Sequence, residues 1–324
     1  MKICVVGAGA IGGWMAVKLA NAGHAVSLIA RGATLAAIQA NGLKLIEGER
    51  TLSATVHAAA DASEIDTPDL LIIAVKAPGL REAALAVKSL IGPHTVVLTA
   101  MNGVPWWFFD RDGRPLSGTQ LVTIDATGEI ASCIPVSHVL GCVVHVACSV
   151  DSPGVIRHRI GQRLIIGEPS GGLSTRLTAL HDALAGAGFA PESTLDIQRD
   201  VWFKLWGNMT MNPVSALTGT TTDIILDDPL AREFCTAVMH EAQAIGEKIG
   251  IVIEQTPEAR HQITRKLGAM KTSMLQDVEA HKGIELDALV AAVCEIGQKV
   301  GVVTPHTHAL LALTRLMARS RGLY

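Results

Sequence analysis

Few residues of this chain are aromatic and few are charged, and both shortages narrow what it can be. Aromatic side chains make up only 3% of the 324 residues, so much of the core must be built from Ala, Val, Leu and Ile. Charged residues make up 18% and hydrophobic ones 49%. Disordered chains are poor in apolar residues and highly charged, so this composition indicates a folded chain. At about 100–200 residues per domain, the length suggests two domains.

The chain also lacks a basic excess, a cysteine motif and a long apolar run. A net charge of -3 leaves no surplus of Lys and Arg to neutralise phosphates, which argues against nucleic-acid binding. None of the six cysteines forms a CxxC pair, so we expect reduced thiols, a cytoplasmic location and no metal. The apolar stretch from Ile3 to Val17 is shorter than the ~20 residues of a membrane-spanning helix, so no membrane partner is expected.

The N-terminal half alternates between strand and helix signals. Short β-branched runs predict strands over 2–7, 25–30, 69–76 and 95–100. A helical pattern over 10–22 lies between the first two, and strand, helix and strand in this order form a βαβ unit with parallel strands. A hairpin over 43–56 and the later segments HVLGCVVHVAC and RLIIG are expected to complete the sheet.

After Gly167 the pattern becomes mostly helical. A turn-rich joint, EPSGG, precedes predicted helices over 174–187, 197–212, 229–250, 257–275, 285–300 and 307–320. The predicted architecture is an α/β Rossmann-type nucleotide-binding domain, residues 1–168, followed by an all-α substrate and catalytic domain, residues 169–324. Ligand pockets concentrate between domains, so we expect the site in the cleft between these two.

A glycine-rich turn joins the first predicted strand to the first predicted helix. It reads GxGxxG, in the strand–turn–helix context that dinucleotide binding requires. Its residues are Gly7, Ala8, Gly9, Ala10, Ile11 and Gly12. The first glycine allows the tight turn, the second lets the backbone approach a pyrophosphate, and the third lets helix and strand pack closely. The helix then offers free N–H groups to the phosphates. The alternative is a turn with packing roles only.

The end of the second predicted strand indicates which dinucleotide binds. NAD enzymes usually place Asp or Glu there, about 20 residues past the glycines, to bind the ribose 2′-hydroxyl. This chain has Ala30 and Arg31 instead, and a guanidinium can pair with a 2′-phosphate, so NADP is predicted. Lys76, at the end of another predicted strand, can add a second positive charge. For each cation the alternative is an exposed surface residue.

One predicted helix carries a polar row on an otherwise apolar segment. Lys204, Asn208 and Asn212 are spaced i, i+4 and i+8 and therefore share a helix face. The opposite face is apolar, and Pro213 is expected to close the helix. A lysine and two amides in one row can supply an acid and several hydrogen bonds to a small polyoxygenated substrate. A solvated polar stripe is the alternative, but the apolar surroundings favour a row that faces something polar inside the protein.

Two further motifs allow a functional and a purely local explanation. Ser273 lies in KTSMLQD, and Glu285 follows twelve residues later at a predicted helix start, where a carboxylate also stabilises the helix N-terminus. Gly283 is expected to interrupt the helix between them. Asn102 and Gly103 follow the predicted strand over 95–100, and Asn-Gly is also a common turn.

Together these motifs resemble the ketopantoate reductase family over nearly the whole chain. The resemblance rests on the N-terminal GxGxxG, Asn102-Gly103, Lys-x-x-x-Asn-x-x-x-Asn-Pro over 204–213, and Ser-Met-Leu-Gln-Asp over 273–277 followed by Glu285. It implies NADPH-dependent reduction of a 2-oxo acid to a 2-hydroxy acid, first of all 2-dehydropantoate to pantoate in pantothenate biosynthesis. The apolar helical half is compatible with a homodimer.

The resemblance also implies roles for individual residues. Lys204 and Glu285 would be catalytic, with Lys204 the proton donor and Glu285 in contact with the substrate or the cofactor ribose. Substrate binding would fall to Asn102, Asn208, Asn212 and Ser273. Asn102 would also contact the nicotinamide end, and Ala147 lies near a cofactor contact of the family. A lysine ammonium about 3 Å from a ketone oxygen can stabilise and protonate the charge that hydride addition builds there.

Two departures from the family pattern bear on the particular substrate. Thr222 replaces a substrate-binding asparagine of the family, and the aromatic segment 106–109 is expected to reshape the pocket mouth. Three other functions stay open from the residues: an NADP-dependent reductase of a different 2-oxo acid, a 3-hydroxyacid dehydrogenase, and a non-catalytic NADP-binding redox sensor. The chain lacks the glycine-rich substrate motif of 3-hydroxyacid dehydrogenases. A non-catalytic redox sensor would not need the polar row.

Overall fold

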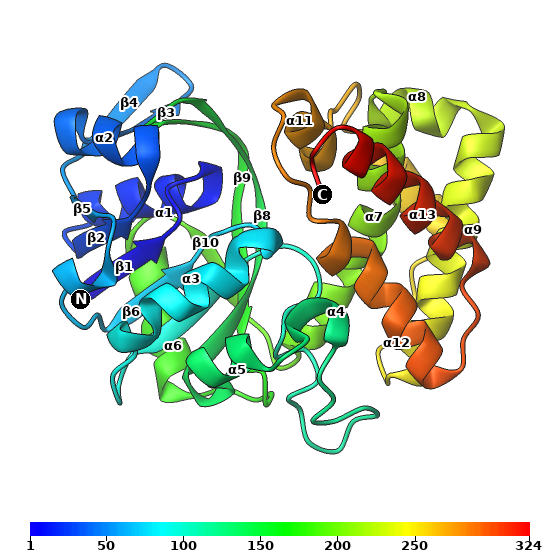
Figure 1. Cartoon of the computed structure of the whole chain (residues 1–324), viewed down its shortest axis with the longest axis horizontal. Coiled ribbons are helices and arrows are strands. Elements are labelled where there is room, and N and C mark those ends of the chain that lie inside the picture. The colour runs from blue at the N-terminus through cyan, green and yellow to red at the C-terminus, as the bar shows by residue number, and fades with distance from the viewer. The chain divides into compact units, whose positions relative to one another are not determined.

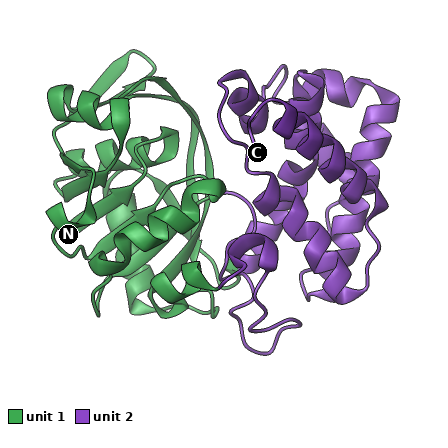
Figure 2. Ribbon diagram, viewed as in Figure 1, with its two compact units in different colours: residues 1–101, 128–197 green, residues 102–127, 198–324 purple.

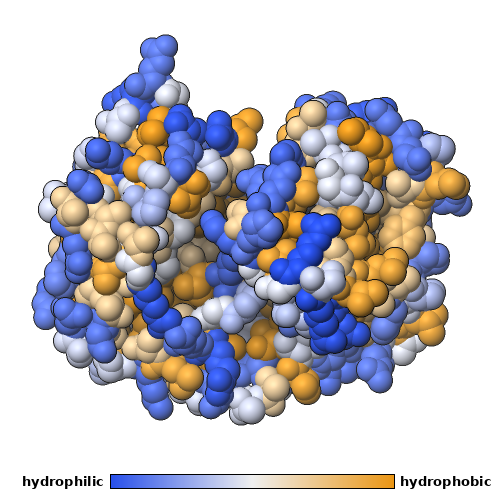
Figure 3. All heavy atoms as spheres, turned by 45° about the horizontal axis from the view of Figure 1, so that its top comes forward, coloured by the Kyte–Doolittle hydropathy of each residue, from blue (hydrophilic) through white to orange (hydrophobic).

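The computed structural model describes all 324 residues and divides into two compact units. Residues 1–101 and 128–197 form the first unit, and residues 102–127 and 198–324 form the second (Figure 2). The first is an α/β unit and the second is helical, which confirms the predicted fold class. On the face in Figure 3, hydrophobic residues are interspersed with hydrophilic ones.

The first unit is built on one mixed sheet (Figure 1). Its strands are β1 (Lys2–Val6), β2 (Ala25–Ile29), β3 (Leu43–Glu47), β4 (Arg50–Ala54), β5 (His57–Ala59), β6 (Leu70–Ile73), β7 (Val96–Ala100), β8 (Val139–Ser152), β9 (Val155–Gly167) and β10 (Ala190–Ser193). Their order is β4-β3-β9-β8-β7-β6-β1-β2-β5, with β10 beside β9. Neighbouring strands pair in parallel except for β3 with β4 and β8 with β9.

Composition explains which strands are central. β6 reads LLII and is buried along its whole length, and β1 is buried from Ile3 to Val6. Strands covered on both faces need continuous apolar runs, whereas a one-sided strand alternates. The helices of this unit are α1 (Ala10–Asn21), α2 (Gly32–Asn41), α3 (Leu80–Val87), α5 (Glu129–Cys133) and α6 (Thr175–Gly186).

The second unit consists of helices around a core that includes two tryptophans of α7. Its helices are α4 (Val122–Asp125), α7 (Ile197–Thr218), α8 (Thr222–Asp227), α9 (Pro229–Lys248), α10 (Pro257–Arg265), α11 (Ser273–Glu279), the π-helical segment η5 (Asp287–Ala291), α12 (Ala292–Val300) and α13 (Pro305–Ser320). Trp202 and Trp206 are fully buried, and the Trp206 Nε1 donates to the Met239 carbonyl of α9 at 2.9 Å. None of the helices has both the length and the apolar character needed to span a membrane.

The long helix α7 does not end at Pro213, so that prediction is wrong. α7 continues to Thr218. Proline lacks the N–H that would bond the carbonyl four residues earlier, which costs about 3 kcal/mol inside a helix. The extra turn buries Val214 and Ala216, and burial of that kind offsets the cost.

Two other predicted helices are divided in the structure. The segment 257–275 forms α10 and α11 with an irregular stretch between them, because Thr272 begins a new helix by accepting a hydrogen bond from the Leu275 N–H. The segment 285–300 starts as a π-helix and continues as α12. Between Ser273 and Glu285 the helix already ends at Glu279, ahead of Gly283.

The compact units do not follow the predicted boundary after Glu168. β10 pairs with β9, so the chain up to 197 stays with the sheet. Residues 102–127 belong to the helical unit, where the Glu295 carboxylate of α12 accepts hydrogen bonds from the backbone N–H groups of Val122 and Thr123. Both segments pack on elements that are distant in the sequence, so the compact units are not contiguous in the chain.

Candidate active site

Two of the three glycines of the glycine-rich turn are required by the packing of the protein itself. Gly7 has φ +99°, and a Cβ there would lie 2.8 Å from the Ala74 carbonyl oxygen beyond β6. A Cβ on Gly12 would lie 1.9 Å from the Gly7 carbonyl oxygen. A Cβ on Gly9 would meet nothing within 4 Å. Gly7 and Gly12 are therefore needed by the fold, whereas Gly9 faces open space.

The helix that follows this turn begins without a side-chain cap. Gly9 is the N-cap of α1 and offers no side chain to the first N–H groups, and the first turn contains no acidic residue. The unsatisfied N–H groups and the positive end of the helix dipole are thus available to an anion. This geometry fits the pyrophosphate of a dinucleotide.

Two cations lie at the same edge of the sheet as the glycine turn. β2 and β6 flank β1, with Val6 opposite both Ile29 and Ile73, so the carboxyl ends of the three strands are adjacent. Arg31 follows β2 as the N-cap of α2, and half-buried Lys76 follows β6. The structure therefore brings Arg31 and Lys76 to the edge where the predicted dinucleotide site lies.

The Arg31 guanidinium has a partner that sequence reasoning missed. Its Nη1 forms an ion pair with Glu82 in the first turn of α3, and the two side chains are 56% and 69% exposed. Exposed ion pairs contribute about 0–1 kcal/mol, so a phosphate can compete for the guanidinium. The remaining cofactor candidate, Ala147, is exposed at a β-bulge of β8, and β7 and β6 lie between β8 and β1 in the sheet.

In the helical unit, the polar row of Lys204, Asn208 and Asn212 on α7 faces other residues of the protein. Asn212 is buried, and Lys204 and Asn208 are half-buried, although all three are polar. The other side of the helix is anchored by buried Trp202 and Trp206. The row is therefore not a solvated stripe, as its apolar surroundings predicted.

Both ends of this row contact residues that the sequence had singled out elsewhere. The Lys204 Nζ donates to the Asn102 Oδ1 at 2.7 Å. The Asn212 Nδ2 donates to the Ser273 Oγ at 3.4 Å, and Ser273 is the first residue of α11. Asn208 lies between them on the same face, one helical turn from each neighbour. The structure thus gathers an ammonium, three amides and a hydroxyl along one line.

Glu285 is joined to the same region through the Asn102-Gly103 turn. Gly103 has φ +84°, and a Cβ there would lie 2.6 Å from the Ala288 Cβ. The Val104 N–H donates to the Ala288 carbonyl at 2.9 Å, so the turn packs on the first helical turn after Glu285. Glu285 is 9% exposed. That turn is π-helical, and π-helical turns occur frequently at functional sites.

Neither departure from the family pattern lies in this row. Thr222 is fully buried, and its Oγ1 donates to the Gly268 carbonyl at 3.2 Å, so it connects α8 to the segment before α11.

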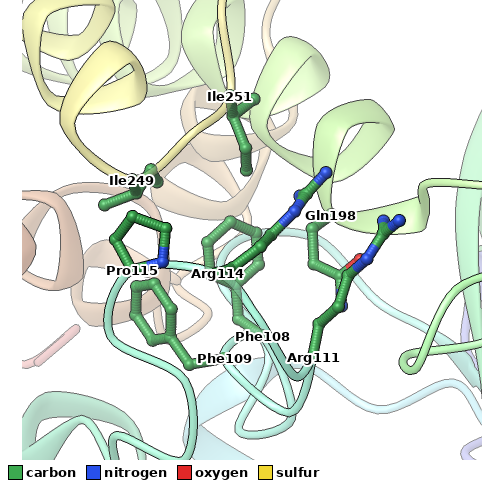
Figure 4. Close-up of a pocket in the computed structure, with 8 residues that line it drawn as sticks. All are labelled: Phe108, Phe109, Arg111, Arg114, Pro115, Gln198, Ile249 and Ile251. Atoms are coloured by element: carbon green, nitrogen blue, oxygen red, sulfur yellow. The ribbon is translucent and has the colours of Figure 1, made fainter.

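The aromatic segment 106–109 is also buried, and its effect on the pocket mouth stays a prediction. Phe108 and Phe109 contribute to a small pocket (Figure 4), lined by Phe108, Phe109, Arg111, Arg114, Pro115, Gln198, Ile249 and Ile251. No residue of the α7 row lines this pocket.

Sequence reasoning missed one residue beside the row, Arg260 of α10. Its Cζ lies 5.2 Å from the centre of the Phe203 ring, and a Cβ on Gly207 would lie 2.9 Å from its Nη2. The available signal was Gly207 itself, because a glycine inside a helix is unfavourable and often marks a close approach. The pattern could not identify the approaching group.

An uncapped glycine-rich βαβ turn, followed by a helical unit with a lysine and amides in one row, defines a dinucleotide-dependent oxidoreductase. The family model described as "Ketopantoate reductase PanE/ApbA" matches residues 3–171, and "Ketopantoate reductase PanE/ApbA C terminal" matches residues 196–318. The chain belongs to the ketopantoate reductase family, as the motifs predicted.

Individual relatives agree with this assignment. A 2-dehydropantoate 2-reductase from Mesorhizobium japonicum is 47% identical over 325 residues, with 100% of both chains covered. A solved structure from Ralstonia solanacearum, assigned as a ketopantoate reductase, is 57% identical with a TM-score of 0.96 and 99% of both chains covered. D-Mandelate dehydrogenase, solved with NADH and anilino(oxo)acetate, is 21% identical with a TM-score of 0.85, covering 99% of this chain and 100% of its own, and shares the fold.

Proposed function

We propose that this chain is an oxidoreductase that reduces 2-dehydropantoate to pantoate with NADPH. The observation that carries the proposal is the α7 row, in which the Lys204 Nζ lies 2.7 Å from the Asn102 Oδ1 and Asn212 contacts Ser273. The row occurs in a chain whose two parts both match the ketopantoate reductase family.

Lys204 is the proton donor in this proposal. When bound, NADPH supplies the hydride that adds to the ketone carbon. Negative charge then develops on the ketone oxygen, and the Lys204 ammonium stabilises it and protonates it. The Asn102 side-chain Oδ1 accepts a hydrogen bond from the same ammonium and so holds Nζ in place.

The other polar residues suit the oxygens of the substrate. The amide groups of Asn208 and Asn212 and the hydroxyl of Ser273 can each donate a hydrogen bond to a carboxylate or hydroxyl oxygen. The Glu285 carboxylate can accept one from the terminal hydroxyl of 2-dehydropantoate. A site of this kind recognises a small, oxygen-rich acid.

NADPH is proposed over NADH because the chain carries Arg31 and Lys76, and no acid, beyond the strands that flank β1. The uncapped start of α1 suits the pyrophosphate. All six cysteines are free thiols, as suits a reducing compartment. The cytoplasmic location and the homodimer stay predictions.

The test compares two substrates that differ in the terminal hydroxyl. With NADPH, we expect reduction of 2-dehydropantoate and much poorer reduction of 2-oxo-3-methylbutanoate. A site that bonds a substrate hydroxyl rejects analogues without it by up to about 10⁴–10⁵-fold, because its own polar groups are left unpaired. Glu285→Gln should narrow that gap in kcat/KM. Glu279→Gln, which removes an exposed carboxylate that pairs with Lys271, is the matched control and should leave it unchanged.

Three results would revise the proposal. Equal rates for the two acids would mean that Glu285 does not bind the hydroxyl. Reduction of only a larger 2-oxo acid would remove 2-dehydropantoate as the substrate and keep the reductase chemistry. NADPH binding without turnover of any 2-oxo acid would favour a redox sensor.

A further inference from the structure

We infer that Arg260 binds the carboxylate of the 2-oxo acid, an inference that rests on the proposed function. Arg260 lies on α10, and its Nε is buried without a hydrogen-bond partner. Its side chain forms no ion pair or hydrogen bond with another residue. By contrast Arg265, on the same helix, pairs with Asp227 and bonds the Leu226 carbonyl. Burying a cation without an anionic partner costs folding free energy, and an anionic ligand that pairs with the cation offsets this cost.

The guanidinium is held against α7, directly beside the polar row. It lies over the Phe203 ring, 5.2 Å from the centre, and against the backbone of Gly207. Phe203 precedes Lys204 in the chain, and Gly207 precedes Asn208. A side chain larger than hydrogen at position 207 would occupy the place of the guanidinium. The helix therefore carries an unfavourable residue at the position where the guanidinium approaches the row.

A 2-oxo acid substrate has a carboxylate that a second cation beside Lys204 would bind. A 2-oxo acid presents a ketone oxygen, which Lys204 serves, and a carboxylate next to it. The rest of the row is neutral, because it consists of amides and a hydroxyl. A guanidinium fork matches a carboxylate with two parallel hydrogen bonds, which a single ammonium cannot do. Burial lowers the pKa of Arg260, and no acidic group offsets this, as expected for a cation that awaits an anionic ligand.

The test separates the carboxylate from the rest of the substrate. For Arg260→Gln we expect KM for 2-dehydropantoate to rise about 10- to 150-fold, the range for loss of a charge-assisted hydrogen bond. KM for the methyl ester of the same acid should change less than about threefold, because the ester carries no charge. NADPH affinity, read by cofactor fluorescence, should not change. Lys266→Gln removes an exposed cation one residue beyond α10 and is the control.

A second variant displaces the guanidinium without removing it. Gly207→Ala places a methyl group where the Nη2 lies 2.9 Å from the ideal Cβ position, so the side chain must move away. We expect the same acid-specific rise in KM. The melting temperature should not fall, since alanine is the better helix former.

Several outcomes would overturn the inference. KM values for acid and ester that rise together, or that both stay at the wild-type level, would show that Arg260 does not bind the carboxylate. If Arg260→Gln fails to fold, Gly207→Ala and Arg260→Lys decide, and an unchanged acid KM in both would refute the role. If wild-type enzyme reduces a different 2-oxo acid, only the proposed substrate fails, and the acid–ester comparison is made on that acid. If the wild-type enzyme reduces no 2-oxo acid, both the proposed function and the role of Arg260 are refuted.

Discussion

At the scale of single residues, the site depends on pairs that are far apart in the sequence. Lys204 and Asn102 are separated by 102 positions, yet the Nζ and Oδ1 atoms lie 2.7 Å apart. An ammonium that donates to a side-chain amide oxygen is held in a defined orientation. A general acid has to be positioned before its pKa matters, because it must reach the atom that it protonates.

Replacing this lysine should affect turnover more than binding. We expect Lys204→Ala to lower kcat about 10²–10⁴-fold, the usual size of a general-acid contribution. NADPH affinity, measured by fluorescence titration, should stay within about twofold, since Lys204 belongs to the helical unit and not to the glycine turn. Lys248→Ala, at the exposed end of α9, is the control. Near-wild-type turnover of Lys204→Ala would refute the assignment.

Arg31 should decide between the two nicotinamide cofactors. Arg31→Ala is expected to raise KM for NADPH about 10- to 150-fold, because it removes a charge-assisted bond to the 2′-phosphate. KM for NADH should hardly change. Glu82→Gln releases Arg31 from its ion pair and should lower KM for NADPH up to about fivefold, the range of an exposed pair. Equal effects of Arg31→Ala on both cofactors would contradict a phosphate contact.

At the scale of elements, the β1–α1 turn separates what the fold needs from what a ligand needs. A Cβ on Gly12 would lie 1.9 Å from the Gly7 carbonyl oxygen, so helix and strand cannot stay in contact with any larger residue there. A Cβ on Gly9 meets no atom of the protein within 4 Å. The same motif therefore contains both kinds of glycine.

Two alanine variants test this distinction. Gly12→Ala should lower the melting temperature by several degrees, corresponding to the 1–3 kcal/mol that overpacking typically costs. Gly9→Ala should leave the melting temperature of the free protein unchanged and weaken NADPH binding, since only the bound pyrophosphate approaches that position. Calorimetry with and without NADPH gives both quantities. Full NADPH affinity in Gly9→Ala would count against a pyrophosphate at this turn.

At the scale of the whole molecule, carboxylates that are buried or half-buried in both units make the free energy of unfolding depend on pH. Burial by itself would raise the pKa of Glu168, Glu241 and Glu295. Hydrogen bonds outweigh burial in each case: from Arg176 and Ser174 to Glu168, from Thr307 and His306 to Glu241, and from Thr123 and Val122 to Glu295. All three pKa values therefore lie below the ordinary 4.5.

The sign of the pH dependence follows from that direction. A carboxyl whose pKa is lower in the folded state contributes stability that is present above about pH 4.5 and is lost as pH falls through the folded value. Glu241→Gln should reduce the free energy of unfolding by about 1–3 kcal/mol at pH 7. The difference from wild type should shrink progressively as the pH falls below about 4.5. Urea unfolding across pH 3–7 measures it, with exposed Glu254→Gln as the control. A difference that stays constant over this range would refute the linkage.

Much of the fold and part of the site could be predicted from local patterns. The continuous apolar runs of β1 and β6 predicted buried parallel strands, and the spacing of glycines between β1 and α1 predicted an open, uncapped helix start. The row of Lys204, Asn208 and Asn212 follows from helical periodicity alone. These features are determined within a few residues of chain, so the sequence contains them.

Only the tertiary structure decided which distant residues contact each of these segments. Asn102 and Ser273 reach the two ends of the row through packing between distant segments, and Arg260 reaches it because Gly207 leaves room. Burial of the next turn carries α7 past Pro213, and the aromatic segment 106–109 is buried in the protein. Helix propensities differ by less than about 1 kcal/mol for ordinary residues and by about 3 kcal/mol for proline. Burial of one large apolar side chain contributes about 1.5–3 kcal/mol, so long-range packing wins where the two conflict.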